Sequence, residues 1–332
     1  MATITKRGPF QYQVQIRRKG YPDQTATFEY RKDAQAWAAD IESEMGRGVF
    51  VDRSEAERTT LGEALLRYER EVTPGKRSAD RESLRIRRLL KHPLASRSLA
   101  SLRSTDMACY RDERGKQVAA NTVRIDLNLL SNLFNVAKKD WSIAVSNPVT
   151  DIRKPKLPKG RDRRLEGDEE RRLLAAVNHW RVRAPTLAFC IQIAIETGMR
   201  AGEIIALTWQ QIDLANRVIR LDLTKNGDGR IVPLTEKAEQ LIRALPRPIN
   251  GGRVTRFHDS NGLSASFRRV CARAGITGLR FHDLRHEAAS RFAPHMPVAT
   301  LAKVMGWRTL QMAMRYYNPK SDELVAAVRR AA

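Results

Sequence analysis

The first sixty residues combine a two-residue repeat of apolar positions with a helical repeat. Apolar and polar side chains alternate over residues 10–16 and 26–30, which is the period of a half-buried strand. Apolar positions from Ala34 to Met45 then recur at helical spacing, and Gly46 and Gly48 are expected to end that helix. The pattern predicts a small sheet packed on one helix.

From Thr60 to Lys139 the pattern is helical throughout. Thr60 stands just before Leu61, Leu65 and Tyr68, so it is predicted to cap a helix whose apolar side faces a core. Three further helices are predicted: one that begins at Ser78 and has Leu84, Leu89 and Leu90 among its arginines, one over residues 105–113 and one over residues 121–139. This segment is therefore expected to be a four-helix domain.

A basic, proline-containing stretch follows the helices. Pro148, Pro155 and Pro158 forbid a continuous helix, and seven Lys and Arg stand against two Asp in NPVTDIRKPKLPKGRDRRL. We interpret it as an extended interdomain linker that lies along phosphates.

The remaining residues mix both periods. A helix capped at Gly167 and Asp168 is followed by a buried helix over residues 187–195, which Thr197 and Gly198 end. Arg200 then begins another helix, and Glu203 can pair with it or orient it. Asn-Gly and Asp-Gly in VIRLDLTKNGDGRIVPL predict a hairpin with Lys225 at its tip.

Charge indicates the class of partner. The 332 residues allow two or three domains, and a formal net charge of +23 points to a polyanion. Residues 1–60 hold 10 Lys and Arg against 9 Asp and Glu, whereas the excess lies in the later two thirds. No apolar run is long enough to span a bilayer, and the N-terminus lacks the apolar core of a signal peptide. We therefore expect a cytoplasmic protein with nucleic acid, not membrane, as its partner.

The charge leaves two surfaces open to more than one interpretation. The polar face of the N-terminal sheet, with Gln13, Gln15 and Arg17, suits a DNA groove or solvent equally well, because residues 1–60 are nearly neutral. Any single arginine of the helical segment is more often a solvated charge than a phosphate contact.

The three cysteines do not suggest a framework of bridges or a zinc site. Cys109, Cys190 and Cys271 are odd in number, far apart and in no C-x-x-C pair. We predict that all three are small buried apolar residues.

Candidate chemistry gathers near the C-terminus. His282 and Arg285 lie three positions apart, so both can occupy one side of a helical turn. Beyond a break at Pro294 and Pro297, Trp307 precedes Tyr316 by nine positions. A guanidinium fork, a hydrogen-bond donor and a phenol suit a phosphodiester, since guanidinium binds phosphate bidentately and a phenol can act as a nucleophile.

Taken singly, these residues have simpler explanations. Arg200 with Glu203 could be a structural ion pair, and a hairpin lysine such as Lys225 is usually solvated. His282 and His286 have the spacing of a helical zinc pair, but H-E-x-x-H needs Glu where Asp283 stands.

The ordered set, however, resembles the tyrosine recombinases of the phage integrase family. The resemblance is carried by TGMRAGEIIALTW, TKNGDGRIVPL, FHDLRH and MGWRTLQMAMRYYNP, in the order and spacing of that family. The stretch TVRIDLNLLSNLFNVAKKDW with KGRDRRLEGDEERRL also resembles shufflon-type plasmid recombinases, which makes DNA inversion one of the expected outcomes beside integration and excision.

The resemblance implies a role for each residue of the set. Tyr316 would attack the scissile phosphate to give a 3′-phosphotyrosine and a free 5′-hydroxyl, while Arg200 and Arg285 hold the non-bridging oxygens. Lys225 would protonate the leaving oxygen, and His282 would aid proton transfer at the tyrosine. Glu203 would support Arg200. No metal or cofactor is implied.

One position departs from the common pattern of the family. Position 307 is His in most members and Trp here, and an indole N–H can donate to phosphate but cannot carry a proton. Tyr317, next to Tyr316, is the competing nucleophile, but the nine-residue offset from Trp307 favours Tyr316.

The resemblance also implies an architecture. We expect a mainly α protein with small β elements that forms a C-shaped DNA clamp. Its parts would be an arm-binding domain at residues 1–58, a helical core-binding domain at 59–150, a linker at 151–164 and a mixed α/β catalytic domain at 165–332. Four protomers would act on two double-stranded DNA sites through a Holliday junction, with the helix SDELVAAVRRA docking on a neighbour. Accessory bending or directionality factors are invisible in the sequence. The alternatives are a type IB topoisomerase-like relaxing enzyme and a DNA-binding protein without catalysis.

Overall fold

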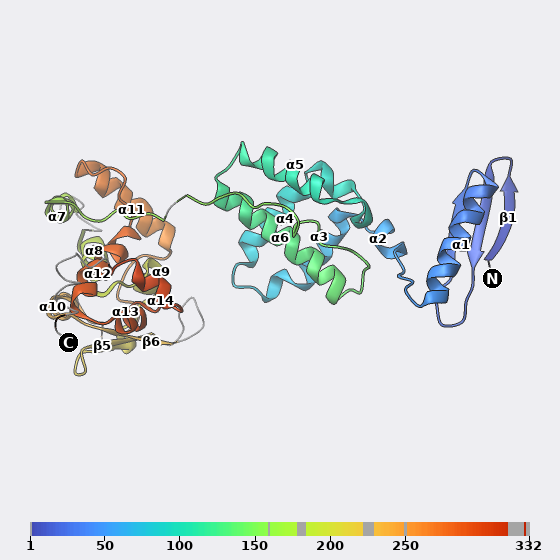
Figure 1. The fold of residues 1–332 in the computed structure, drawn as a ribbon. Helices are drawn as coiled ribbons and strands as arrows, with labels where there is room; N and C mark the ends of the chain where they lie inside the picture. The colour runs from blue at the N-terminus through green and yellow to red at the C-terminus, as the bar shows by residue number, and fades with distance from the viewer. Residues whose placement is uncertain are drawn as a thin grey trace. The chain divides into compact units, whose positions relative to one another are not determined.

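The computed structural model describes residues 2–158, 160–177, 184–221, 229–248, 251–317 and 329. Two compact units, residues 1–159 and 160–332, make up the chain (Figure 1). The described residues are mainly helical, with two small sheets, as expected from the sequence. None of the described helices has the length and the apolar character required to cross a lipid bilayer.

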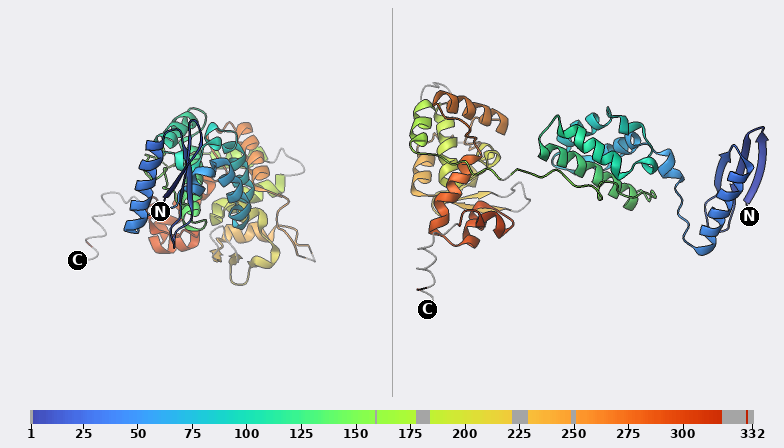
Figure 2. Two further views of the ribbon diagram at one scale, coloured as in Figure 1. Left: turned by 90° about the vertical axis from the view of Figure 1, so that its right-hand side faces the viewer. Right: turned by 45° about the horizontal axis from the view of Figure 1, so that its top comes forward.

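The N-terminal part of the first unit is a three-stranded sheet covered by one helix. The antiparallel strands run in the order β1 (Ala2–Gly8), β2 (Gln11–Ile16) and β3 (Gln24–Phe28), and α1 (Arg31–Arg47) lies along one face of the sheet (Figure 2). Val14 and Ile16 of β2 are fully buried against α1 because alternate residues share a face. Gly48, with φ of +71°, ends the helix as predicted.

The rest of the first unit is helical. Thr60 caps its second helix with a complete capping box, in which the Thr60 side chain accepts from the Glu63 backbone and Glu63 accepts from the Thr60 backbone. Its helices, both α and 3-10, are α2 (Ser54–Arg58), α3 (Leu61–Glu71), η1 (Thr73–Gly75), α4 (Ala79–Leu89), η2 (Pro93–Ser96), η3 (Leu99–Ser101), α5 (Ser104–Gly115) and α6 (Ala120–Lys139). Their apolar sides form one core with Tyr68, Ile86 and Phe134 among its fully buried side chains.

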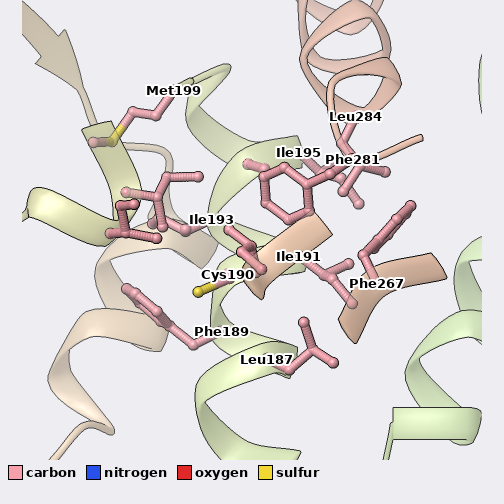
Figure 3. Packing of buried hydrophobic residues seen from close by; sticks show 14 of the residues in the cluster. Leu187, Phe189, Cys190, Ile191, Ile193, Ile195, Met199, Phe267, Phe281 and Leu284 are labelled. Carbon is pink, nitrogen blue, oxygen red and sulfur yellow. The ribbon is translucent and has the colours of Figure 1, made fainter. Parts of the chain in front are cut away.

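The second unit packs helices around one long buried helix, α8 (Ala184–Thr197). Figure 3 shows Ile191 of this helix beside Phe267 and Phe281, which meet edge to face, and Phe189 and Cys190 on its other side. A small antiparallel sheet of β4 (Ile212–Asp213), β5 (Val218–Leu221) and β6 (Arg230–Pro233) stands beside it. The other helices are α7 (Glu169–Val177), α9 (Ala201–Ala206), η4 (Trp209–Gln211), α10 (Glu236–Arg243), α11 (Ser260–Arg273), α12 (Asp283–Phe292), η5 (Ala293–His295), α13 (Val298–Met305) and α14 (Leu310–Met314).

One expectation of burial was wrong. Cys109 is exposed on α5, while Cys190 and Cys271 are buried as predicted. Leu84 of α4 is 60% exposed, because Ile86 and Leu89 occupy the side of the helix that meets the core. Interleaved arginines hid which of these apolar residues share one face.

Candidate active site

The turn between α8 and α9 positions Arg200. Gly198 adopts φ of +63° and ends α8, and Arg200 is the N-cap residue of α9. The Arg200 backbone N–H donates to Glu203 Oε2 at 2.8 Å and its guanidinium donates to Glu203 Oε1 at 2.8 Å. Glu203 therefore holds both ends of Arg200, as the sequence pattern suggested.

Glu203 is shared with a second arginine. Arg230, at the start of β6, lies 2.6 Å from Glu203 Oε2, and the side chains of both residues are less than 10% exposed. Burial raises the pKa of Glu203, but Arg230 and the hydrogen bonds from Arg200 outweigh it, so the pKa lies below its usual value. Glu203 is consequently a carboxylate at neutral pH.

Arg285, on the first turn of α12, is the most buried cation of the site, with 4% of its surface exposed. Its guanidinium donates to the carbonyl oxygens of Gly198 and Met305. Burial, with Arg200 and Arg230 nearby, lowers the pKa of Arg285 to about 9, which still leaves it charged at neutral pH.

The three arginines converge on the C-terminal end of α13. Consecutive carbonyl groups of Val304, Met305 and Gly306 accept hydrogen bonds from Arg230, Arg285 and Arg200 respectively. These carbonyls carry the negative end of the helix dipole and lack partners within the helix, so they suit cationic donors. The structure thus brings Arg200 and Arg285, which are 85 positions apart in sequence, to one helix end.

Tyr316, just after α14, lies between two rings. The indole of Trp307 stacks on it at 5.3 Å between centroids and 7° between planes. The imidazole of His286 lies on it at 6.0 Å and 29°, and the Tyr316 hydroxyl is hydrogen-bonded to His286 Nδ1. Trp307 also lies under Arg285, whose guanidinium carbon is 5.7 Å from the indole centroid.

Environment sets the protonation of the two partners in this hydrogen bond. Burial raises the pKa of Tyr316, although Arg315 and Arg285 lower it in part. Burial also lowers the pKa of His286 to about 4, and His282 and Arg315 add to that effect. At neutral pH a protonated phenol therefore donates to an uncharged imidazole.

His282 is the exposed N-cap residue of α12, next to His286. Its ring contacts the His286 ring edge to face, with centroids 5.4 Å apart. Among the described residues, no group of three or more His, Cys, Asp or Glu could hold a metal ion.

The structure bears differently on Lys225, on the C-terminal helix and on Tyr317, the competing nucleophile. Lys225 and the proposed docking helix SDELVAAVRRA lie outside the described residues, apart from Arg329. The hairpin predicted around Lys225 is present as β5 and β6. Tyr317 turns elsewhere, because its hydroxyl donates to the Met296 carbonyl at 2.6 Å.

Sequence reasoning missed His286 and Arg230 as members of the site. His286 stands four residues after His282, so it shares a helix side with it, but that spacing suggested only a zinc ligand. Arg230 closes the hairpin motif and carried no signal of its own.

The first residues of the second unit bind α12 on both sides of Arg285. Arg161 contacts both carboxylate oxygens of Asp283 at 3.0 Å, and Arg164 together with the Leu165 backbone N–H donates to Glu287. Asp283 and Glu287 are buried. Arginines that the sequence placed on the phosphates of a linker therefore have carboxylate partners in the second unit. Arg315, beside Tyr316, also binds Asp162 of this segment.

The known sequences that this chain resembles are integrases and recombinases. Residues 163–323 match the model of the phage integrase family. The chain is 38% identical to a shufflon-specific DNA recombinase of Escherichia coli, over 80% of this chain and 71% of the relative. It is 35% identical to an integrase/recombinase of Haemophilus influenzae, over 97% of this chain and 89% of the relative.

Solved structures with a similar fold are integrases bound to DNA. A lambda integrase dimer on a COC′ core site has a TM-score of 0.67 and 19% identity, covering 95% of this chain and 94% of that one. The Tn1549 transposon integrase bound to transposon right end DNA has a TM-score of 0.66 and 21% identity, over 82% of this chain and all of that one.

The sequence matches, the cluster of described arginines and the stacked tyrosine all point to the same family. The chain belongs to the phage integrase family of tyrosine recombinases, enzymes that cut and rejoin DNA in site-specific recombination.

Proposed function

We propose that Tyr316 is the nucleophile of this recombinase. Its hydroxyl would attack the scissile phosphate, forming a 3′-phosphotyrosine bond and releasing a 5′-hydroxyl. The observation that carries this assignment is the position of Tyr316, between Trp307 and His286 and one ring away from the buried guanidinium of Arg285.

Arg200 and Arg285 would neutralise the phosphate as charge develops on its non-bridging oxygens. Arg200, Arg230 and Arg285 have Glu203 as their shared carboxylate neighbour, so the helix end of α13 carries an excess of positive charge. Arg200 is 21% exposed at its side chain, which leaves part of it accessible to a ligand. Burial and the repulsion from Arg200 and Arg230 lower the pKa of Arg285, and an anion bound here would relieve that repulsion.

The leaving 5′-oxygen would take its proton from Lys225, and the Trp307 indole N–H would donate to a phosphate oxygen. Beside Trp307 a pocket of about 600 Å3 is lined by Arg230, Lys303 and Arg308, among others. Those cations suit the DNA backbone.

We infer the larger arrangement from the relatives. Residues 1–58 would bind arm-type DNA and residues 59–150 the core site, with residues 151–164 as the linker of a C-shaped clamp closed by the catalytic domain, residues 165–332. Solved structures of lambda integrase include a tetramer bound to a Holliday junction. A homotetramer that exchanges strands between two sites is the assembly we propose here, with accessory bending or directionality factors as further partners in the cytoplasm.

The shufflon relative suggests the outcome of the reaction. That recombinase is 38% identical to this chain, so we propose DNA inversion between paired sites, ahead of integration or excision. A type IB topoisomerase-like enzyme would relax supercoiled DNA with no dependence on paired sites, whereas a recombinase yields an exchanged product only when two sites are present.

Replacing the nucleophile tests the assignment. Tyr316→Phe removes only the hydroxyl, so binding to the DNA site is expected to persist while the covalent adduct on a nicked suicide substrate disappears. Gel shift measures the first and denaturing gels measure the second.

Tyr317→Phe is the matched control, because it removes a neighbouring hydroxyl that bonds to Met296. It should form adduct at the wild-type level and lose about 1 kcal/mol of stability. Adduct formed by Tyr316→Phe at the wild-type level would refute the assignment.

A further inference from the structure

The hydroxyl of Tyr316 already has a hydrogen-bond acceptor, and it is not His282. Nδ1 of His286 contacts the Tyr316 oxygen, whereas the ring of His282 contacts the ring of His286. The residue that receives the phenolic proton should be the one in contact with it, because proton transfer needs hydrogen-bond distance.

Trp307 makes such an acceptor necessary. Its indole lies flat on Tyr316, but indole has no basic nitrogen and cannot accept the proton. Tyr316 cannot ionise unaided either, because burial keeps its hydroxyl protonated at neutral pH. The attack therefore requires a base at the tyrosine.

We propose that His286 is the general base of the cleavage step and the general acid of the rejoining step, a role that rests on Tyr316 being the nucleophile. In cleavage, the Tyr316 oxygen bonds to phosphorus and the phenolic proton moves to His286 Nδ1. The bond from phosphorus to the 5′-oxygen breaks, and Lys225 protonates that oxygen. In rejoining, the 5′-hydroxyl gives its proton to Lys225 and attacks phosphorus, the bond from phosphorus to Tyr316 breaks, and His286 returns its proton to the phenolate.

The surroundings of His286 suit both directions. Burial disfavours the charged form of His286, and the nearby His282, Arg315 and Arg285 add to this effect. Asp283 favours the charged form. The imidazole of His286 is consequently uncharged before the attack, so it can accept the phenolic proton. Negative charge that develops on the phosphate then favours the imidazolium, so the proton is held only while the covalent intermediate exists.

His286→Asn tests the proposal in the full-length protein. Asparagine places a polar atom near the position of Nδ1 but cannot take up a proton. We expect unchanged DNA binding and a single-turnover cleavage rate on a nicked suicide substrate about 100-fold lower at neutral pH. The remaining rate should rise about tenfold per pH unit as the phenol ionises, whereas the wild-type rate should stay level.

A second substrate separates the base from the acid. A sulfur atom in place of the bridging 5′-oxygen makes a leaving group that needs no proton. This substrate should restore cleavage by Lys225→Ala and leave His286→Asn as slow, relative to wild type, as on normal DNA. His295→Asn, which changes an exposed histidine of η5, should behave as wild type.

The outcomes distinguish failure of the Tyr316 assignment from failure of the role proposed for His286. Adduct formation by Tyr316→Phe would overturn the nucleophile and with it this proposal. If Tyr316→Phe is inactive but His286→Asn cleaves at the wild-type rate, or recovers on the sulfur substrate, the nucleophile stands and the role of His286 is wrong.

Discussion

At the end of α13, three neighbouring carbonyl groups accept hydrogen bonds from Arg230, Arg285 and Arg200. Three guanidiniums in so small a volume repel one another, and Glu203 neutralises two of them directly. A buried carboxylate of this kind is costly to desolvate but more costly to remove, because its partners would remain charged. Glu203 is therefore the residue that organises the proposed phosphate site.

Glu203→Gln should destabilise the protein. Breaking a buried pair costs about 3 kcal/mol, measured as the free energy of unfolding in urea at neutral pH. The folded pKa of Glu203 lies below its usual 4.5, so its stabilisation is full above that pH and is lost as pH falls through the folded value. The difference between the variant and wild type should shrink accordingly in acid.

Glu166→Gln is the control, since its side chain is 76% exposed and its ion pair with Arg163 is a surface one. It should change stability by less than about 1 kcal/mol. Equal stabilities for Glu203→Gln and wild type at neutral pH would show that the three arginines do not depend on this carboxylate.

The sequence was sufficient to nominate Arg200, Arg285 and Tyr316, because the ordered set to which they belong resembles that of the tyrosine recombinases. It was not sufficient for His286. Its partner Tyr316 lies 30 positions further along the chain, and only the packing of α12 against the segment after α14 brings the two together. No local pattern reports such a contact.

Among the elements, the α8–α9 turn depends on its glycine. Gly198 has φ of +63°, and a Cβ there would come within 2.6 Å of the sulfur of Met305. The carbonyls of Gly198 and Met305 both bind Arg285. A side chain at position 198 would thus disturb the two groups that orient the buried guanidinium.

Gly198→Ala is expected to lower stability by about 2 kcal/mol, from the left-handed backbone and the contact with Met305. Because Arg285 would be displaced, cleavage of the suicide substrate should fall by more than the loss of folded protein explains. Gly202→Ala, on α9 where an added Cβ would meet no atom within 4 Å, should retain cleavage and gain up to about 1 kcal/mol. Equal cleavage by both variants would argue against this role of the turn.

The elements themselves were largely predictable where a cap marked the boundary. Thr60 begins α3 and Gly48 ends α1, both as expected. The strand β1 was missed, because ATITKRG has few apolar residues and gains its stability from pairing with β2. The two-residue β4 is too short to show a period.

At the scale of the whole molecule, the first residues of the second unit are bound to α12. Arg161 and Arg164 follow the boundary at residue 160 and bind Asp283 and Glu287, which stand two residues before and after Arg285. This basic stretch thus binds α12 through carboxylates. Its sequence showed the charge but not the partner, because the acidic residues lie over 120 positions away.

The net charge of +23 agrees with a partner that is itself a polyanion. The family membership supplies the reaction, and the described site supplies the residues that we propose perform it. All of these assignments depend on one chemical event, the esterification of Tyr316.

Peptide mapping of the trapped complex tests that event most directly. The full-length protein would be incubated with a nicked suicide substrate carrying its site, and the adduct digested with nuclease and protease and analysed by mass spectrometry. We predict a nucleotide attached through a 3′-phosphate to Tyr316, in the peptide that also contains Tyr317. A nucleotide on Tyr317 or on any other residue, or cleaved DNA with no protein attached, would contradict the account.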